Sequence, residues 1–219
     1  GRDLGWGITL GLRGNEDLPQ VFDGTPQSLF LYQPPGADFR NSDYDSQEVL
    51  NGSENEEMLG YRALWFYLLN QGVVRTGTAN SDSHGITDNV LGTPRNLVWT
   101  DSLVGEFDSA EFNGRIKEGQ VLGTNGPVIE ATMRDASGGS RRPGVEPFTP
   151  GADLSLDLRV SAVPWVPVEE IRIVVNGEVA LTLRDELSAP ADRLGTGELL
   201  RFEGTIDLAP LLPDSGDAW

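Results

Sequence analysis

The sequence contains no cysteine, only one histidine, and no long uninterrupted apolar run. Without cysteine, a disulfide scaffold and a thiolate zinc site are both excluded. A membrane-spanning helix needs about 18 or more consecutive apolar residues, so we expect no membrane span. The first residues, Gly1 to Trp6, lack the pattern of a signal peptide. The compartment therefore stays open between the cytosol and an exported location.

Basic residues are also scarce, with 16 lysines and arginines against 34 acids and a net charge of −18. A phosphate backbone would be repelled by this charge, which argues against nucleic acid or an anionic membrane as partner. A phosphate ester could still bind where a metal ion supplies local positive charge. The length of 219 residues allows one or two domains, and 27 glycines indicate many turns.

The single histidine lies in the stretch Asn80-Ser81-Asp82-Ser83-His84-Gly85. The apolar segment 73–79 before it has the composition of a buried strand. Side chains two positions apart point the same way along an extended chain, so Asp82 and His84 can converge just beyond the strand end. A carboxylate and an imidazole are ligands that zinc, manganese and iron accept. The alternative is an Asx-type turn with a solvated histidine.

The residues around this stretch resemble those of a known family. Several segments follow one another in a characteristic order: Gln47-Glu48-Val49-Leu50-Asn51-Gly52, Trp65-Phe66-Tyr67-Leu68-Leu69-Asn70-Gln71-Gly72, Thr76 to His84, Gly92-Thr93-Pro94-Arg95-Asn96 and Gly123-Thr124-Asn125-Gly126-Pro127. Together they resemble the PHP (polymerase and histidinol phosphatase) superfamily of metal-dependent phosphoesterases, in its carbaryl-hydrolase-like branch. The resemblance covers roughly residues 39 to 130.

This resemblance implies a distorted (β/α)7 barrel in which a metal-bound hydroxide attacks an ester. It implies Asp82 and His84 as catalytic metal ligands. The family's early His-x-His is absent here, and there is no second histidine. We therefore expect this chain to correspond to the C-terminal part of such a barrel, with the rest of the barrel upstream and the divalent metal site (Zn, Mn or Fe) incomplete.

Two further residues are candidates for the same site. Glu48 lies in a short predicted strand and could point to the pocket of Asp82 as a third metal ligand, although Asn51-Gly52 alone accounts for a turn there. Arg95 is the cation near the histidine stretch and could hold a substrate oxyanion. The alternative for Arg95 is an exposed ion pair with Asp88 or Asp101.

Local patterns predict the elements of the first part, residues 1–133. Extended segments are expected at 8–10 and 28–32. The order Ser53-Glu54-Asn55-Glu56 has the form of a capping box, and helical apolar spacing follows as far as Leu69, with Gly72 as the stop. Asp108 can cap a short helix that ends near Gly119.

Beyond a linker or long loop at 134–151, the apolar period changes to two. Leu154, Leu156 and Leu158 alternate with polar residues, as do Ile171 and Ile173, and a type I′ turn is predicted at Asn176-Gly177 before a returning strand. Another strand is expected over 200–206. We therefore predict α/β followed by all-β: residues 152–219 form a small antiparallel β-sandwich-like domain.

Two functions follow from the sequence. The first is the C-terminal part of a metal-dependent hydrolase acting on a small-molecule ester. The second is a non-catalytic binding or structural module whose β domain recognises a glycan, a protein or a neighbouring subunit. The segments that resemble the family favour the first, whereas the missing ligands favour the second for this polypeptide alone.

Overall fold

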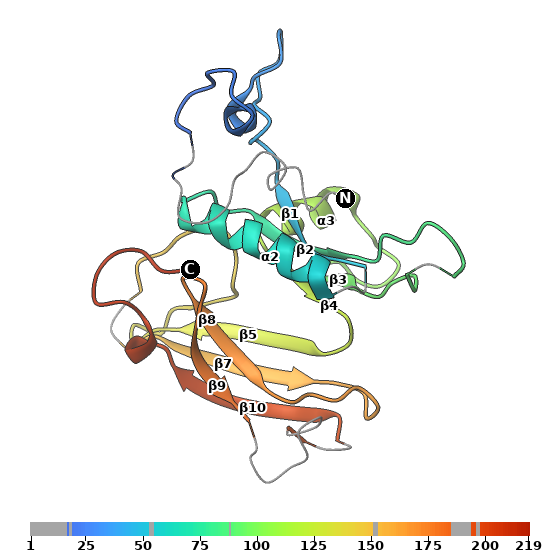
Figure 1. The fold of residues 1–219 in the computed structure, drawn as a ribbon. Coiled ribbons are helices and arrows are strands. Elements are labelled where there is room, and N and C mark those ends of the chain that lie inside the picture. The colour runs from blue at the N-terminus through green and yellow to red at the C-terminus, as the bar shows by residue number, and fades with distance from the viewer. Residues whose placement is uncertain are drawn as a thin grey trace. The chain divides into compact units, whose positions relative to one another are not determined.

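The computed structural model describes residues 17, 19–52, 55–87, 89–150, 153–184, 194–195 and 198–219. The chain divides into two compact units, Gly1–Gly123 and Thr124–Trp219, each with its own core (Figure 1). The described elements of the first unit are η1 (Gln27–Leu31), β1 (Ser46–Asn51), α2 (Asn55–Asn70), β2 (Thr76–Asn80), β3 (Arg95–Val98), α3 (Ser109–Lys117) and β4 (Val121–Thr124). Those of the second are β5 (Val128–Arg134), β6 (Ser140–Arg141), β7 (Ser155–Ser161), β8 (Ile171–Val175), β9 (Glu178–Leu183), β10 (Leu200–Asp207) and η3 (Ala209–Leu211).

The centre of the first unit is a β1–α2–β2 crossover. β1 and β2 are parallel, and the ends of the two strands pair as Asn51 with Asn80. Parallel strands need a long connection, and α2 supplies it. Gly77 lies where a Cβ would stand 3.0 Å from Val49 and 3.1 Å from Trp65, so glycine lets α2 and β1 approach β2 closely.

The helix α2 ends at Asn70, just before Gly72, which confirms the prediction that Gly72 stops it. This glycine has φ +74° and donates its N–H to Leu69, while Val73 donates to Leu68, both at 2.9 Å. These two bonds are the Schellman pattern that ends a helix. Val73 then packs beside the buried cluster of Phe30, Leu64, Tyr67 and Leu68. The predicted capping box at Ser53 lies outside the residues whose side chains the structure describes.

The prediction of an extended segment at 28–32 is wrong. Residues Gln27–Leu31 form the 3-10 helix η1, which buries Ser28 and Phe30. Ser28 donates its N–H to the Thr25 carbonyl at 3.1 Å, and its hydroxyl donates to the same oxygen. These local bonds compete with an extended backbone, a usual effect of serine near a turn. The extended segment predicted at 8–10 lies outside the described residues.

The rest of the first unit packs β3, α3 and β4 beside β2. Asp108 caps α3 as predicted, accepting from the Ala110 N–H at 2.8 Å. A Cβ on Gly123 would meet the Cβ of Ala79 at 2.9 Å, so only glycine allows β4 this close to β2. Ala79 itself is 1% exposed. The described strands of this unit form two separate two-stranded sheets, β1–β2 and β3–β4.

The second unit is built of antiparallel strands, in agreement with the all-β prediction. One sheet has the order β10-β7-β5-β6 and the other pairs β8 with β9. In Figure 1, β8 and β9 cross the strands of the larger sheet. One apolar cluster joins the two sheets, with Leu154, Leu158, Val160, Ile206 and Leu208 buried and Leu156, Ile171, Ile173 and Leu181 packed against them.

The hairpin predicted at Asn176-Gly177 is confirmed. Both residues have positive φ, +51° and +86°, as a type I′ turn requires, and β8 pairs with β9 on either side. The alternation predicts that the polar residues between the apolar ones are exposed. Arg172 is exposed, whereas Ser155 and Asp157 are only half-exposed. Asp157 bonds to Arg134 and Thr205 on the neighbouring strands, which covers part of its side chain.

The division between the units differs from the predicted one. The Gly- and Ser-rich composition of 134–151 placed the boundary there, whereas the structure divides the chain after Gly123. The reason is long-range pairing: β5 lies beside β7 from Val128↔Ser161 to Arg134↔Ser155, and β6 adds Ser140–Arg141 to the same sheet. Within the part of the chain that the structure describes, no helix is long and apolar enough to cross a membrane.

Arg201 holds together the loops at one end of the second unit. The residue is 4% exposed, and its guanidinium donates to the carbonyls of Val166, Val163 and Leu194 at 3.0, 3.2 and 3.3 Å. It also donates to Gly195 and Pro164. A buried charge is tolerated because these carbonyl dipoles replace its water.

We expect Arg201→Met to lower the free energy of unfolding by about 3 kcal/mol, because hydrogen bonds to a charged group are lost and carbonyls are left unpaired. Urea denaturation followed by circular dichroism measures the change. The matched control is Arg159→Met on β7, whose half-exposed side chain pairs with Glu130 and Glu203 and should cost at most about 1 kcal/mol. Equal effects of the two substitutions would contradict the prediction.

Candidate functional site

The stretch Asn80 to His84 leaves the carboxyl end of β2, as predicted, beside the strand that carries Glu48. Asp82 takes the left-handed conformation with φ +49°, which turns the chain directly after the strand. Its Oδ1 lies 3.5 Å from Nδ1 of His84. The two side chains are 48% and 74% exposed, so both are open to a ligand from solvent.

A hydrogen bond sets the tautomer of His84. Its Nδ1 lies 2.7 Å from the backbone carbonyl of Asp82. A carbonyl can only accept, so Nδ1 carries the proton and Nε2 carries the lone pair of the neutral ring. Histidine ligands of metals are commonly held in this way, with the second ring nitrogen donating to a carbonyl or carboxylate.

Glu48 lies at the same edge of the β1–β2 sheet and is bound by two amides. Its Oε1 accepts from Nδ2 of Asn80 at 2.7 Å, and its Oε2 accepts from Nδ2 of Asn51 at 2.9 Å. Asn80 in turn accepts at Oδ1 from Nδ2 of Asn96 at 3.2 Å. Because the strands are parallel, the side chains at their ends meet at one edge, and this polar group results.

The structure brings Asp82 and His84 together but does not add Glu48 to them. Among the described residues, no three His, Cys, Asp or Glu side chains are grouped closely enough to hold a metal ion. Catalytic zinc generally has three protein ligands. The oxygen and imidazole donors therefore suit a divalent ion in kind, but the pair provides one ligand fewer than such a site needs.

The side chain of Arg95 contacts the loop just before it. Arg95 is exposed, and its Nη1 donates to the carbonyl of Gly92 at 3.1 Å. The alternative partner Asp101 pairs instead with Arg115, and Asp88 lies outside the described residues. The guanidinium therefore keeps further N–H groups for another acceptor, but no contact in the described structure joins it to Asp82 or His84.

Asn80 and Asn96 belong to this polar group, although the sequence did not predict it. Both residues stand in the segments that resemble the family, yet nothing in the local pattern shows that Asn96 bonds to Ala79, 17 positions earlier. An asparagine at the start of a strand is usually a turn residue. Only its position next to β2 reveals the role.

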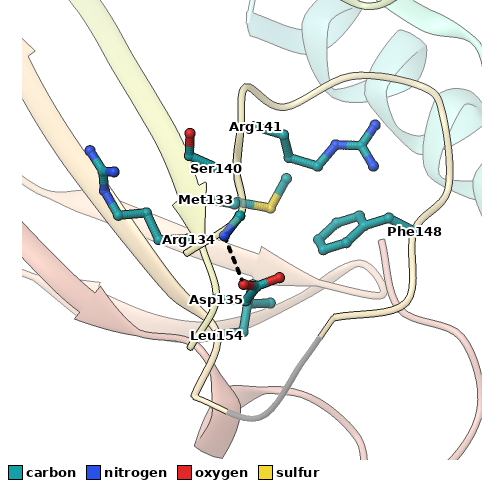
Figure 2. A pocket seen from close by; sticks show the side chains of 8 residues that line it. Met133, Arg134, Asp135, Ser140, Arg141, Phe148 and Leu154 are labelled. Carbon is teal, nitrogen blue, oxygen red and sulfur yellow. Dashed lines mark hydrogen bonds between the residues drawn. The ribbon is translucent and has the colours of Figure 1, made fainter. Parts of the chain in front are cut away.

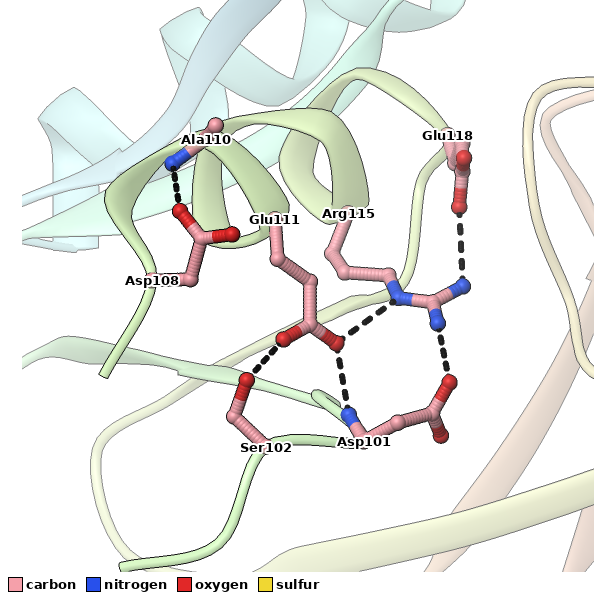
Figure 3. Close-up of polar contacts among 7 residues, drawn as sticks. All are labelled: Asp101, Ser102, Asp108, Ala110, Glu111, Arg115 and Glu118. Carbon is pink, nitrogen blue, oxygen red and sulfur yellow. Dashed lines mark hydrogen bonds and ion pairs between the residues drawn. The ribbon is translucent and has the colours of Figure 1, made fainter. Parts of the chain in front are cut away.

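A second polar cluster, around Glu111 on α3, has a structural explanation (Figure 3). Glu111 accepts from the Ser102 hydroxyl and from the Asp101 N–H, and Arg115 pairs with Asp101, Glu111 and Glu118. These bonds tie the loop after β3 to α3. The Ser102 hydroxyl, the Asp101 N–H and the Arg115 charge hold the pKa of Glu111 below its ordinary value of 4.5.

The second unit has a cavity of about 140 Å³ between β5, β6 and the following loop (Figure 2). Met133, Leu154 and Phe148 give it apolar walls, and the guanidinium of Arg141 lies 4.8 Å from the Phe148 ring. Oδ1 of Asp135 accepts from Ser137 and Gly139. In Figure 2 its other oxygen points toward Phe148. An aromatic ring beside polar groups is a common element of a ligand site.

No family model, no curated protein and no solved structure matches this chain.

Because the pKa of Glu111 is lowered on folding, its contribution to stability is fully present above its ordinary value of 4.5 and is lost as pH falls through the lowered value. We expect Glu111→Gln to lower the urea midpoint at neutral pH, and the gap from the wild type to narrow steadily below about pH 4.5. Glu106→Gln, at an exposed position before α3, is the control. A gap that is independent of pH would contradict the assignment.

Proposed function

We propose that this chain contributes to a metal-dependent hydrolase, most simply a phosphoesterase, with Asp82 and His84 as metal ligands. The observation that carries the proposal is that Asp82 and His84 stand side by side at the carboxyl end of β2, with Oδ1 of Asp82 3.5 Å from the protonated Nδ1 of His84 and the lone pair of Nε2 left for a ligand. In folds with parallel strands and crossover helices, reactive groups come from the loops at this end. The segments that resemble the PHP superfamily support the same proposal. They also support the proposal that residues 1–133 are the C-terminal part of a PHP-like β/α barrel.

Each residue has a distinct part in this proposal. His84 presents the lone pair of Nε2, because its Nδ1 donates to the backbone carbonyl of Asp82. Asp82 offers a half-exposed carboxylate. Glu48, on the neighbouring strand, is the candidate for a third ligand, although the described structure does not group it with the pair. A divalent ion held by these residues would supply positive charge and lower the pKa of a bound water. That charge would also offset the repulsion between an anionic ester and a chain of net charge −18.

Arg95 is the proposed contact for the substrate. It follows the histidine loop on β3, and its bond to Gly92 uses only one of its five N–H groups. The remaining donors suit two oxygens of a phosphate ester.

The cavity of the second unit favours a second candidate function, recognition of a glycan or a peptide by the β domain. Its apolar walls, the Phe148 ring and the polar groups of Asp135 and Arg141 are the combination that binds a small polar ligand. This function needs no metal and no residue of the first unit.

We expect the chain of residues 1–219 to bind Mn²⁺ weakly, with a Kd above the micromolar range, because the Asp82–His84 pair lacks a third ligand. For the same reason, we expect negligible hydrolysis of p-nitrophenyl phosphate. Asp82→Ala and His84→Ala should each abolish that weak binding in calorimetry. Asp214→Ala, an exposed acid of the second unit, should leave it unchanged. Mn²⁺ binding that is unaffected by Asp82→Ala and His84→Ala would contradict the ligand assignment. Tight stoichiometric metal with steady hydrolysis would contradict the expectation of an incomplete site.

For the second candidate, we expect Phe148→Ala and Arg141→Ala to abolish binding of the full chain to an array of glycans and short peptides, because both residues form the cavity wall. The control is Trp165→Ala, which removes an aromatic ring that is 80% exposed and lies outside the cavity. Absence of binding by the wild type, or loss in the control alone, would exclude this function for the cavity.

A further inference from the structure

The first unit also has a cavity, of about 290 Å³, which is formed within residues 20–40. These residues belong to the blue segment before β1 in Figure 1. Apolar and aromatic side chains make up most of the lining (Val21, Phe22, Leu31 and Tyr32), and Gln33 and Arg40 add polar groups. Small-molecule sites have volumes from about 300 Å³ upward and the same mixture of many apolar and few polar groups. The size and the lining of this cavity therefore suit one small organic molecule.

Hydrogen bonds tie the part of the lining that carries Phe22 to η1. The N–H of Asp23 donates to the Ser28 hydroxyl at 3.2 Å, and Oδ1 of Asp23 accepts from the N–H and the hydroxyl of Thr25 at 2.9 and 2.7 Å. Ser28 is completely buried. The bonds from Thr25 and Ser28 lower the pKa of Asp23 to about 2, so its carboxylate is charged at neutral pH and keeps these bonds. Phe22 is thus held in place by the turn that follows it.

A second set of bonds brings Arg40 to the cavity. The N–H of Asn41 donates to the carbonyl of Tyr32 at 2.9 Å, and Nδ2 of Asn41 donates to the carbonyl of Leu29 at 2.9 Å. The N–H of Arg40 donates to Oδ2 of Asp43 at 2.7 Å. These bonds close the loop between Tyr32 and Arg40, so an aromatic ring and a guanidinium line the same cavity.

An aromatic pair forms one wall. The ring centroids of Phe22 and Tyr32 are 5.1 Å apart, and the rings meet edge to face at 62°. Leu31, next to Tyr32, packs against the buried cluster of η1 and α2, which anchors this part of the lining in the core of the unit. Phe22 nevertheless keeps 45% of its surface exposed. A ligand with a flat apolar body would remove this surface from water, which favours binding.

Arg40 gives the cavity its charge. It is the one charged residue among the described residues of the lining, and its guanidinium has no hydrogen bond or ion pair within the part of the chain that the structure describes. Several other arginines of this acidic chain pair with carboxylates, among them Arg115, Arg134, Arg159 and Arg172. The paired N–H groups of a guanidinium match the two oxygens of a carboxylate. Arg40 is thus available to a ligand that carries one negative charge.

We propose that this cavity binds a small aromatic carboxylate, with the ring of the ligand against Phe22 and Tyr32 and its carboxylate on Arg40. A neutral aromatic molecule would offer the guanidinium only an uncharged acceptor, and an aromatic amine would bring a second positive charge close to it. The site needs no metal ion and no residue of the β2 edge. It is therefore independent of the proposed hydrolase and of the cavity in the second unit.

The first test compares three ligands of similar size on the full chain by fluorine NMR. We expect para-fluorobenzoate to bind, para-fluorobenzamide to bind about tenfold more weakly, and para-fluorobenzylamine not to bind, because only the benzoate offers Arg40 a charged acceptor. Equal affinities for the benzoate and the amide would overturn the choice of a carboxylate. A wild type that binds no para-fluorobenzoate would overturn the site itself.

The second test asks whether Arg40 supplies the charge. Arg40→Gln should weaken benzoate binding about tenfold and remove its advantage over the amide. Arg40→Lys should keep part of that advantage, because it retains the charge without the paired N–H groups. The matched control is Arg142→Gln, which removes an exposed arginine of the second unit and should change neither affinity. A preference for the benzoate that survives Arg40→Gln would overturn the role of Arg40.

The third test locates the ring of the ligand. Phe22→Ala should weaken binding of the benzoate and of the amide about tenfold, because both rings lose the same wall. The control is Phe39→Ala, which removes a phenylalanine that is 52% exposed and lies outside the lining, and should leave both affinities unchanged. Circular dichroism shows whether each variant is folded.

Nuclear Overhauser contacts in the wild type give a readout of the ring position that needs no substitution. We expect them between the ring protons of para-fluorobenzoate and those of Phe22 and Tyr32. Equal effects of Phe22→Ala and Phe39→Ala on the affinities, or contacts of the bound ligand with other aromatic residues only, would overturn the proposed location.

Discussion

The parallel pairing of β1 with β2 is the constraint on which the candidate site depends. Two parallel strands end at the same edge, so Asn51 and Asn80 stand next to each other, and the bond from the Gly52 N–H to the Asn80 carbonyl continues the pairing past the strand end at 2.9 Å. The crossover through α2 is possible because Gly77 leaves room for Trp65 and Val49. An antiparallel pair would have put Glu48 and Asp82 at opposite ends.

The edge of β2 that faces away from β1 raises a different problem, because the backbone groups of a buried strand need partners. Ala79 is almost completely buried, and its N–H and C=O are satisfied by the Asn96 side chain instead of another strand. A structural need at Ala79 thereby determines the direction of the amides that reach Glu48. One set of hydrogen bonds thus satisfies the backbone of β2 and organises the polar group beside Asp82 and His84.

The second unit depends on apolar packing between two antiparallel sheets. A buried arginine, Arg201, forms hydrogen bonds with its loops. Leu158 and Val160 of β7 are buried against partly buried residues of β8 and β9. Arg201, at the start of β10, supplies donors for loop carbonyls that no strand can satisfy. The cavity beside Phe148 lies at the rim of the larger sheet, where β6 and its loop meet β5.

The sequence by itself determined the features that depend on neighbouring residues: the β8–β9 hairpin at Asn176-Gly177, the end of α2 at Gly72, the cap of α3 at Asp108, and the position of Asp82 and His84 after a strand. Alternating apolar residues and turn glycines act over a few positions, so they can be interpreted locally. Only the tertiary structure decided that β5 pairs with β7 across 134–154, that 27–31 forms a 3-10 helix on the α2 core, and that Asn96 reaches Ala79. These features depend on partners far along the chain, and no local pattern records which backbone groups a long-range neighbour will leave unsatisfied.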